Sequence, residues 1–245
     1  MTTSQAGSNS RVNVESDDKT PGSHGGLVLV CKRVSPFETS NLECVRGAFR
    51  DVMPCPLRQC WQPEASPAFA PASVYTAWVG RALFVYAELV DADIHTQATG
   101  LNQRLWELGD AFEMFLGVQG EESYIEFQVA PNNQRLQLRY ANRAAVEQAR
   151  ATGDMAHALI PGEAFHSRVW VQDDCSRWHV LATIPASAVC SANVPLVGSR
   201  WRFSFSRYDY TRGGGDPVIS STSPHAQADF HRQQEWGALH FRDHQ

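Results

Sequence analysis

Short segments of alternating apolar and polar residues, separated by clusters of turn-forming residues, run through most of the chain after residue 26. Such period-2 alternation is typical of β-strands that bury one face. It predicts strands at 27–31, 42–49, 73–90 (two strands joined across Gly80 and Arg81), 110–118, 123–129, 135–140, 167–171, 177–184, 200–208 and 236–242. The Ala-rich segment 142–152 predicts a single short helix. About ten strands without strand–helix alternation favour an all-β fold, a single antiparallel β-sandwich.

The alternation is clearest in the middle of the chain. Over 123–129, the apolar residues Ile125, Phe127 and Val129 alternate with polar ones, and 135–140 repeats the pattern. An antiparallel sheet of this kind commonly packs one face on the core and exposes the other. We therefore expect the second face of these strands to contact water.

Composition and charge narrow the classes of function. The 245 residues include 21 Lys plus Arg and 26 Asp plus Glu, which gives a net charge of −5 without any basic run. We therefore expect no nucleic-acid partner. No apolar stretch approaches the roughly 20 residues of a membrane-spanning helix, so we expect no membrane partner and a soluble monomer.

Residues 1–26 are polar and rich in Ser, Gly and Thr, and they lack the apolar region of a secretory signal. This composition predicts a disordered tail followed by one domain over 27–245. The missing signal predicts a cytoplasmic location. The six cysteines would then remain thiols, whereas an oxidising compartment would allow disulfides.

Motifs of catalysis and of metal binding are mostly missing. The chain has no G-x-S-x-G elbow, no phosphate-binding loop and no H-E-x-x-H pair. The glycines at 213–215 predict a hairpin tip, because no helix start follows them. Cys55 and Cys60 have no second pair at zinc-finger spacing. We assign no catalytic residue, no cofactor and no metal ligand, and leave a calcium ion open without an assigned site.

Two carboxylates fall on adjacent predicted strands. Glu113 and Glu126 both belong to the face expected to be polar. Glycosidases use two carboxyl groups at a defined separation, so the pair is a candidate for glycoside hydrolysis. The alternative interpretation is that both are ordinary solvated side chains of a surface strand.

Trp106 differs from the other tryptophans. Trp178 and Trp201 fall at inward strand positions and are expected in the core, whereas Trp106 lies in the predicted loop 99–109, before the strand with Glu113. The flat face of an indole stacks on a pyranose ring while nearby polar groups bind its hydroxyls. Trp106 therefore predicts a sugar platform, and the alternative is a lid folded onto the core.

Six segments, in order, resemble carbohydrate-binding module family 9. The segment LWELGDAFEMFL (105–116) is similar to that family's Trp followed by an acid-bearing strand. The other five are LFVYAELVDADI (83–94), YIEFQVAPN (124–132), Trp178 with IPASAV (184–189), GSRWRFSFSRYD (198–209) and DFHRQQEWGALHF (229–241). Together the resemblance covers about residues 27–242.

This resemblance implies a jelly-roll-like β-sandwich of the DOMON-like group. It also implies a non-catalytic protein that grips terminal sugars of a saccharide, in a family associated with glycosyl hydrolases and polysaccharide catabolism. Carried over by position, Trp106 would stack on the sugar, Glu113 would bind its hydroxyls and Arg135 would partner Glu113. A carboxylate accepts hydroxyl donors and an Arg fork donates in a fixed plane.

The chain departs from the family pattern late in the sequence. The second stacking Trp of such modules has no counterpart between Trp201 and Trp236. Tyr208 and Tyr210 would replace it, or the grip is one-sided. One strand of the family carries Asn before an Arg. Here serine precedes Arg207. Arg207 is therefore a candidate site residue, but the amide contact of the family's Asn is missing.

Some DOMON relatives bind haem through Met and His, which gives an alternative function, electron transfer. Met114 with His179 or His231 would supply the axial ligands. Met114 falls on the predicted core side of its strand, and His231 is expected to be structural. Carbohydrate binding is therefore the preferred hypothesis.

Overall fold

The computed structural model describes residues 26–190 and 196–243, so that residues 1–25 of the expected tail lie outside the described part. Its strands are β1 (Val28–Arg33), β2 (Cys55–Pro56), β3 (Ala72–Val79), β4 (Ala82–Val90), β5 (Ala111–Val118), β6 (Tyr124–Val129), β7 (Arg135–Tyr140), β8 (His166–Gln172), β9 (Arg177–Pro185), β10 (Arg200–Asp209), β11 (Val218–Ser221) and β12 (Gly237–Arg242). Its α-helices are α1 (Leu42–Ala48), α2 (Leu105–Leu108), α3 (Arg143–Thr152) and α4 (Ala186–Val189). None of these helices is long and apolar enough to span a bilayer.

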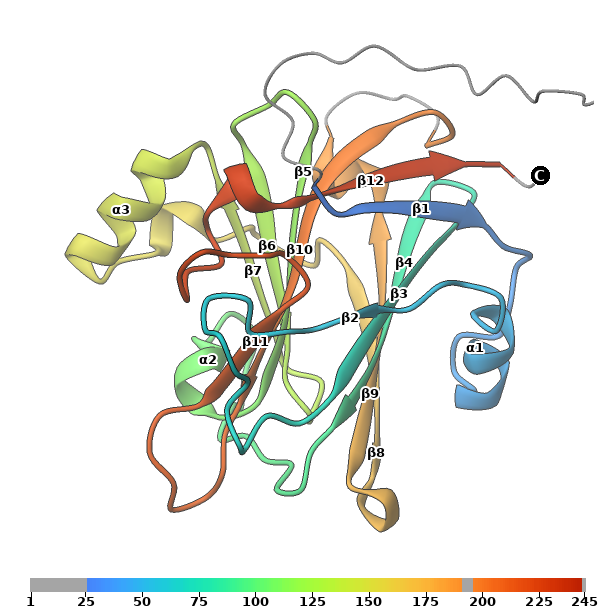
Figure 1. Ribbon diagram of the computed structural model, residues 1–245. Coiled ribbons are helices and arrows are strands. Elements are labelled where there is room, and N and C mark those ends of the chain that lie inside the picture. The colour runs from blue at the N-terminus through green and yellow to red at the C-terminus, as the bar shows by residue number, and fades with distance from the viewer. Residues whose placement is uncertain (1–25, 191–195, 244–245) are drawn as a thin grey trace, which may run out of the picture.

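The strands form one curled sheet in the order β7-β6-β5-β10-β12-β1-β3-β4-β9-β8, with β11 paired to β10 and β2 to β3. In Figure 1 the half with β5, β6, β7 and β10 stands beside the half with β3, β4, β8 and β9, and β12 and β1 run between them. The expected all-β sandwich is confirmed. The sheet is mixed rather than wholly antiparallel, because β1 runs parallel to both β12 and β3. These strands are distant in sequence, so no hairpin imposes an antiparallel pairing on them.

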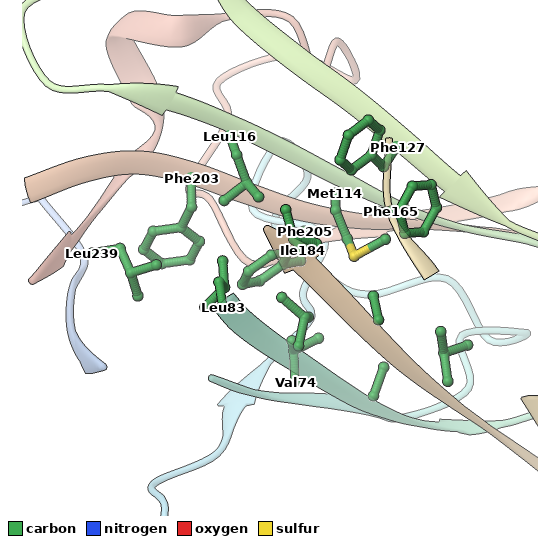
Figure 2. Packing of buried hydrophobic residues seen from close by; sticks show 14 of the residues in the cluster. Val74, Leu83, Met114, Leu116, Phe127, Phe165, Ile184, Phe203, Phe205 and Leu239 are labelled. Atoms are coloured by element: carbon green, nitrogen blue, oxygen red, sulfur yellow. The ribbon is translucent and has the colours of Figure 1, made fainter. Parts of the chain in front are cut away.

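The main core fills the space between the two halves. Phe127 of β6 stacks on Phe165, with ring centroids 4.3 Å apart. Trp178 and Trp201 are buried in the same cluster, as their inward positions predict. Figure 2 shows how side chains of both halves interdigitate there: Val74, Leu83, Met114, Leu116, Phe127, Phe165, Ile184, Phe203, Phe205 and Leu239.

The prediction of a strand over 42–49 is wrong, because this segment forms α1. The side chain of Asn41 accepts hydrogen bonds from the backbone N–H groups of Glu43 and Cys44, at 2.9 and 3.2 Å. This is the N-cap arrangement that satisfies free donors at a helix start. Val45 turns inward and is fully buried. The cap and one buried position therefore determine the helix, which apolar content alone did not reveal.

The remaining predicted strands are confirmed, as is the helix over 142–152, which is α3. The glycines at 213–215 lie in the connection between the antiparallel strands β10 and β11, as the hairpin prediction requires. The sequence did not predict β11 or the single-turn helices α2 and α4. Each has only four residues, too few for periodicity to appear.

The prediction of a second face in contact with water holds for Arg139 of β7, which is exposed, but is wrong for the second face of β6. Glu126 and Gln128 of that face are at most 3% exposed. The helix α3 and the chain between β11 and β12 cover it, with Trp236 packed on Phe115 and Tyr124 at ring distances of 5.7 and 5.0 Å. A strand's own alternation does not show which later segments will pack over its polar side. This covered face holds the candidate site.

Candidate functional site

A pocket of about 320 Å³ lies on the covered face of β5, β6 and β10, between α2, α3 and the chain before β12. Its apolar walls are formed by Trp106, Phe115, Tyr140, Val146, Ala149, Met155, Tyr208 and Phe230. Its polar and charged lining consists of Arg104, Glu107, Glu113, Glu126, Arg150, Asp229 and His231. This volume is at the lower end of the range for small-molecule sites, so the pocket suits a small ligand or the end of a longer one.

Trp106 lies in α2 and forms one side of the pocket while remaining partly exposed. The Tyr210 hydroxyl donates a 2.6 Å hydrogen bond to the Trp106 carbonyl. The helix ends at Gly109, whose φ of 136° is one that residues with a Cβ rarely adopt. A Cβ there would also lie 2.6 Å from the carbonyl oxygen of His95. Gly109 and Tyr210 therefore fix how the chain turns from the Trp106 helix into β5.

Glu113 and Glu126 form the floor, and each is 3% exposed. The amide nitrogen Nε2 of Gln128 donates to Oε1 of both glutamates, at 2.6 Å in each case. Those two carboxylate oxygens are therefore at most twice that distance apart. The other oxygen of Glu126, Oε2, has no hydrogen-bond partner and lies 3.6 Å from Nε2 of His231. The floor is thus a close pair of acids joined by one amide.

Burial dominates the electrostatics of this floor. It raises the pKa of Glu126 to about 7, against the opposing effect of the Gln128 hydrogen bond. Burial, followed by the negative charge of Glu126, raises the pKa of Glu113 well above its ordinary value. Burial lowers the pKa of His231 to about 3, so its ring is neutral near pH 7. At neutral pH the glutamate pair therefore retains a proton.

An ion-pair network closes the pocket on the side of α3. Asp229 binds Arg143 at 3.1 Å and Arg150 at 2.8 Å, which fastens the chain before β12 to the helix. Burial alone would raise the pKa of Asp229, but the hydrogen bonds and charges of the two arginines outweigh it and hold the pKa below the ordinary range. His231 follows in the same segment, and its Nδ1 lies 2.6 Å from the Tyr124 hydroxyl.

The structure brings three of the sequence-predicted residues together. Trp106, Glu113 and Tyr208 all line the pocket. Tyr210 lies beside them and holds the Trp106 backbone without lining the pocket itself. Glu126, which the sequence suggested only as the second acid of a glycosidase, is adjacent to Glu113 in the floor.

The two predicted arginines lie elsewhere. Arg135 of β7 donates to the Glu163 carboxylate at 2.7 Å and to the Phe165 carbonyl at 2.9 Å, and it does not line the pocket. Arg207 is fully buried and faces the side of β10 opposite to Tyr208, because adjacent strand residues point to opposite faces.

Arg207 pairs with Asp91 at 2.9 Å and with Asp209 at 3.0 Å. The carboxylates of Asp91, Asp110 and Asp209 lie within 4.8 Å of one another, the one group of this kind in the described ranges. The Arg207 guanidinium pairs with two of these carboxylates and two backbone N–H groups donate to Asp110, whereas Oδ2 of Asp91 is buried without a hydrogen-bond partner. Calcium remains without an assigned site.

The structure places neither candidate histidine beside Met114. Met114 points into the main core, whereas His231 packs on Phe115, from the opposite face of β5. His179 lies on the outer face of the other half, stacked on Tyr86 and 3.0 Å from its hydroxyl. The described residues thus do not assemble the Met–His pair that the haem hypothesis requires.

Sequence reasoning missed the part of the site contributed by α3 and by the chain before β12. Arg150 belongs to a helix whose sequence carries no binding motif. Asp229 and Phe230 fall within the closing segment 229–241 of the family resemblance, in which only His231 is interpreted, as a structural residue or a haem ligand. The family resemblance was therefore the one signal that could have indicated this wall.

The fold of the chain is that of a carbohydrate-binding module of family 9. No protein-family model and no curated protein sequence matches the chain. Solved structures match it across 89% of its length. One is a Bacteroides uniformis ATCC 8492 protein for which carbohydrate binding has been suggested (TM-score 0.67, 18% identity, 100% of that chain covered). Two are structures of a family 9 module of Caldicellulosiruptor kristjanssonii. The complex with cellotriose has a TM-score of 0.60 and 14% identity, with 95% of that chain covered. The complex with glucose has a TM-score of 0.61 and 14% identity, with 97% of that chain covered.

Proposed function

We propose that this chain is a non-catalytic carbohydrate-binding protein that takes the end of a saccharide into the Trp106 pocket. The observation that carries the proposal is an indole wall set against a floor of buried carboxylates in a pocket of monosaccharide scale. The fold shared with modules solved in complex with glucose and cellotriose supports it. By the family resemblance, the ligand would come from the breakdown of a polysaccharide by a glycoside hydrolase.

Each wall has a role in this proposal. The indole of Trp106 stacks on the C–H face of the sugar ring. Glu113 and Glu126 accept hydrogen bonds from ring hydroxyls, and burial strengthens these bonds because water does not compete. Tyr208 and Phe230, which contact each other with ring centroids 5.9 Å apart, form an apolar wall of the same pocket. Because one tryptophan rather than two grips the sugar, we expect a dissociation constant of about 10⁻⁴ M, or about −5.5 kcal/mol.

Calorimetric titration with glucose, cellobiose and xylo-oligosaccharides tests the proposal, with tryptophan fluorescence followed in parallel. We expect Trp106→Ala to abolish binding while the far-UV circular dichroism spectrum stays unchanged. Trp170→Ala is the matched control, because Trp170 is also partly exposed but lies on β8 in the other half of the sheet. Binding by Trp106→Ala at wild-type affinity would show that the pocket is not the sugar site.

The glutamate pair also supports a second candidate function, glycoside hydrolysis. Retaining glycosidases hold two carboxyl groups about 5–5.5 Å apart, one of them with a raised pKa. Glu113 and Glu126 form a comparably close pair, with their Oε1 atoms at most twice 2.6 Å apart, and burial raises the pKa of both. Incubation with a panel of aryl glycosides separates the two functions: turnover that Glu113→Gln abolishes would establish the enzyme, whereas binding without turnover supports the module.

A further inference from the structure

The charges that line the pocket are unevenly paired. Two arginines and four acids contribute to the lining. Each arginine already binds an acid at the rim: Arg104 pairs with Glu107 at 3.1 Å, and Arg150 pairs with Asp229 at 2.8 Å. The two acids of the floor have no arginine or lysine partner among the described residues. The deepest part of the pocket therefore holds the two acids that lack a cationic partner.

Neutral groups surround this floor. The groups that face it are the phenols of Tyr124, Tyr140 and Tyr208, the ring of His231 and the amide of Gln128. Burial raises the pKa of each phenol and lowers that of the imidazole, which keeps all four uncharged near pH 7. Arg150 lowers the pKa of Glu126 only through space, without a direct contact to it.

Two acceptor oxygens of the floor, Oε2 of Glu126 and Oε1 of Gln128, are left without a hydrogen bond. Oε2 of Glu126 is buried, accepts no hydrogen bond and belongs to a side chain that lines the pocket. A buried carboxylate oxygen in this state is costly unless a ligand or a proton completes it. A ligand group at this position would need more than one donor, because both glutamates line the pocket and share a single amide donor.

We propose that the pocket prefers a saccharide that carries a free amino group, whose ammonium is held between Glu113 and Glu126. This inference rests on the proposed function. An ammonium has three N–H donors and a positive charge, which match two carboxylates that share a single amide donor. A hydroxyl supplies one donor and no charge, and an acetylated amine also lacks the charge, so both complement this floor less well.

Binding of the amine involves a proton exchange. Near pH 7 the empty pair retains at least one proton, held on a carboxyl oxygen as an O–H bond. When the ammonium enters, each such O–H bond breaks and its proton passes to the buffer, while the ammonium keeps its own protons. Both carboxylates are then ionised and paired with the ligand. Neutral sugars bind without this release, because they bring no charge to replace the proton.

Isothermal titration calorimetry with 2-amino-2-deoxyglucose, glucose and N-acetylglucosamine at pH 6.5 tests the proposal. We expect the wild-type protein to bind the amino sugar about tenfold or more tightly than the other two, a difference of about 1.4 kcal/mol. Its binding heat should depend on the ionisation enthalpy of the buffer. Glu126→Gln should reduce the preference to within about threefold, whereas Glu122→Gln, a change at an exposed surface position, should keep it.

Equal affinity of the wild-type protein for glucose and for the amino sugar would overturn this inference and leave the proposed function standing. No binding of any of the three sugars, or of cellobiose, would overturn both. If Glu126→Gln does not fold, the wild-type titration in two buffers decides the matter. A heat for the amino sugar that is the same in both buffers would then contradict the proton exchange and the proposal with it.

Discussion

The buried glutamate pair should make the protein less stable as the pH rises from about 4.5 to about 7. Glu126 has an ordinary pKa of 4.5, and burial raises it to about 7 in the folded chain. A carboxyl with a raised folded-state pKa favours folding fully below its unfolded pKa, and this contribution is lost as the pH rises through the folded value. The size of this effect is about 3 kcal/mol, at 1.36 kcal/mol for each pH unit between the two values.

Other buried groups act in the opposite direction. Burial lowers the pKa of His179 to about 4 and that of His231 to about 3. Each histidine must gain a charge as the pH falls below about 6.5 in the unfolded chain, so stability is lost toward acid. The wild-type pH profile mixes these contributions. The difference between the wild type and Glu126→Gln reports mainly on the glutamate pair, because the substitution leaves both histidines in place.

Urea unfolding at half-unit steps between pH 5 and pH 8 measures this difference. As the pH rises across that range, we expect the free energy of unfolding of Glu126→Gln to increase by about 3 kcal/mol relative to that of the wild type. The substitution also removes the negative charge that partly raises the pKa of Glu113, and this adds to the gain in stability. Exposed Glu122→Gln should follow the wild type at every pH. A wild-type-minus-variant difference that stays flat from pH 5 to pH 8 would refute the reasoning.

Three further outcomes follow from the described contacts. Arg207→Ala leaves the buried carboxylate of Asp91 and the partly buried carboxylate of Asp209 without their cation and should lower the free energy of unfolding by about 3–5 kcal/mol, measured in urea. Gly237→Ala places a Cβ 2.6 Å from the Phe203 ring and should cost about 1–3 kcal/mol, which a thermal melt would detect. Tyr210→Phe removes the hydrogen bond to the Trp106 carbonyl and should weaken sugar binding by severalfold in calorimetry, with little change in melting temperature.

The sequence predicted what depends on local alternation and missed what depends on distant segments. The strands from β3 to β10 show their period-2 patterns, and Trp106 and Glu113 lie close enough in the chain for one motif to join them. The side of β10 that holds Arg207 was not evident, because a buried charge is recognised only by its partners. The wall made by α3 and Asp229 likewise depends on contacts between segments far apart in the chain.

The pairing of β1 with β12 constrains how the molecule can be assembled. These two strands are first and last among those described, and in the sheet order they connect the half containing β10 to the half containing β3. During synthesis the two halves would be made as unjoined sheet fragments until the final strand emerges from the ribosome. Contacts of such long sequence separation slow folding and leave strand edges exposed meanwhile. A nascent chain stalled before residue 237 would therefore be a natural substrate for chaperones.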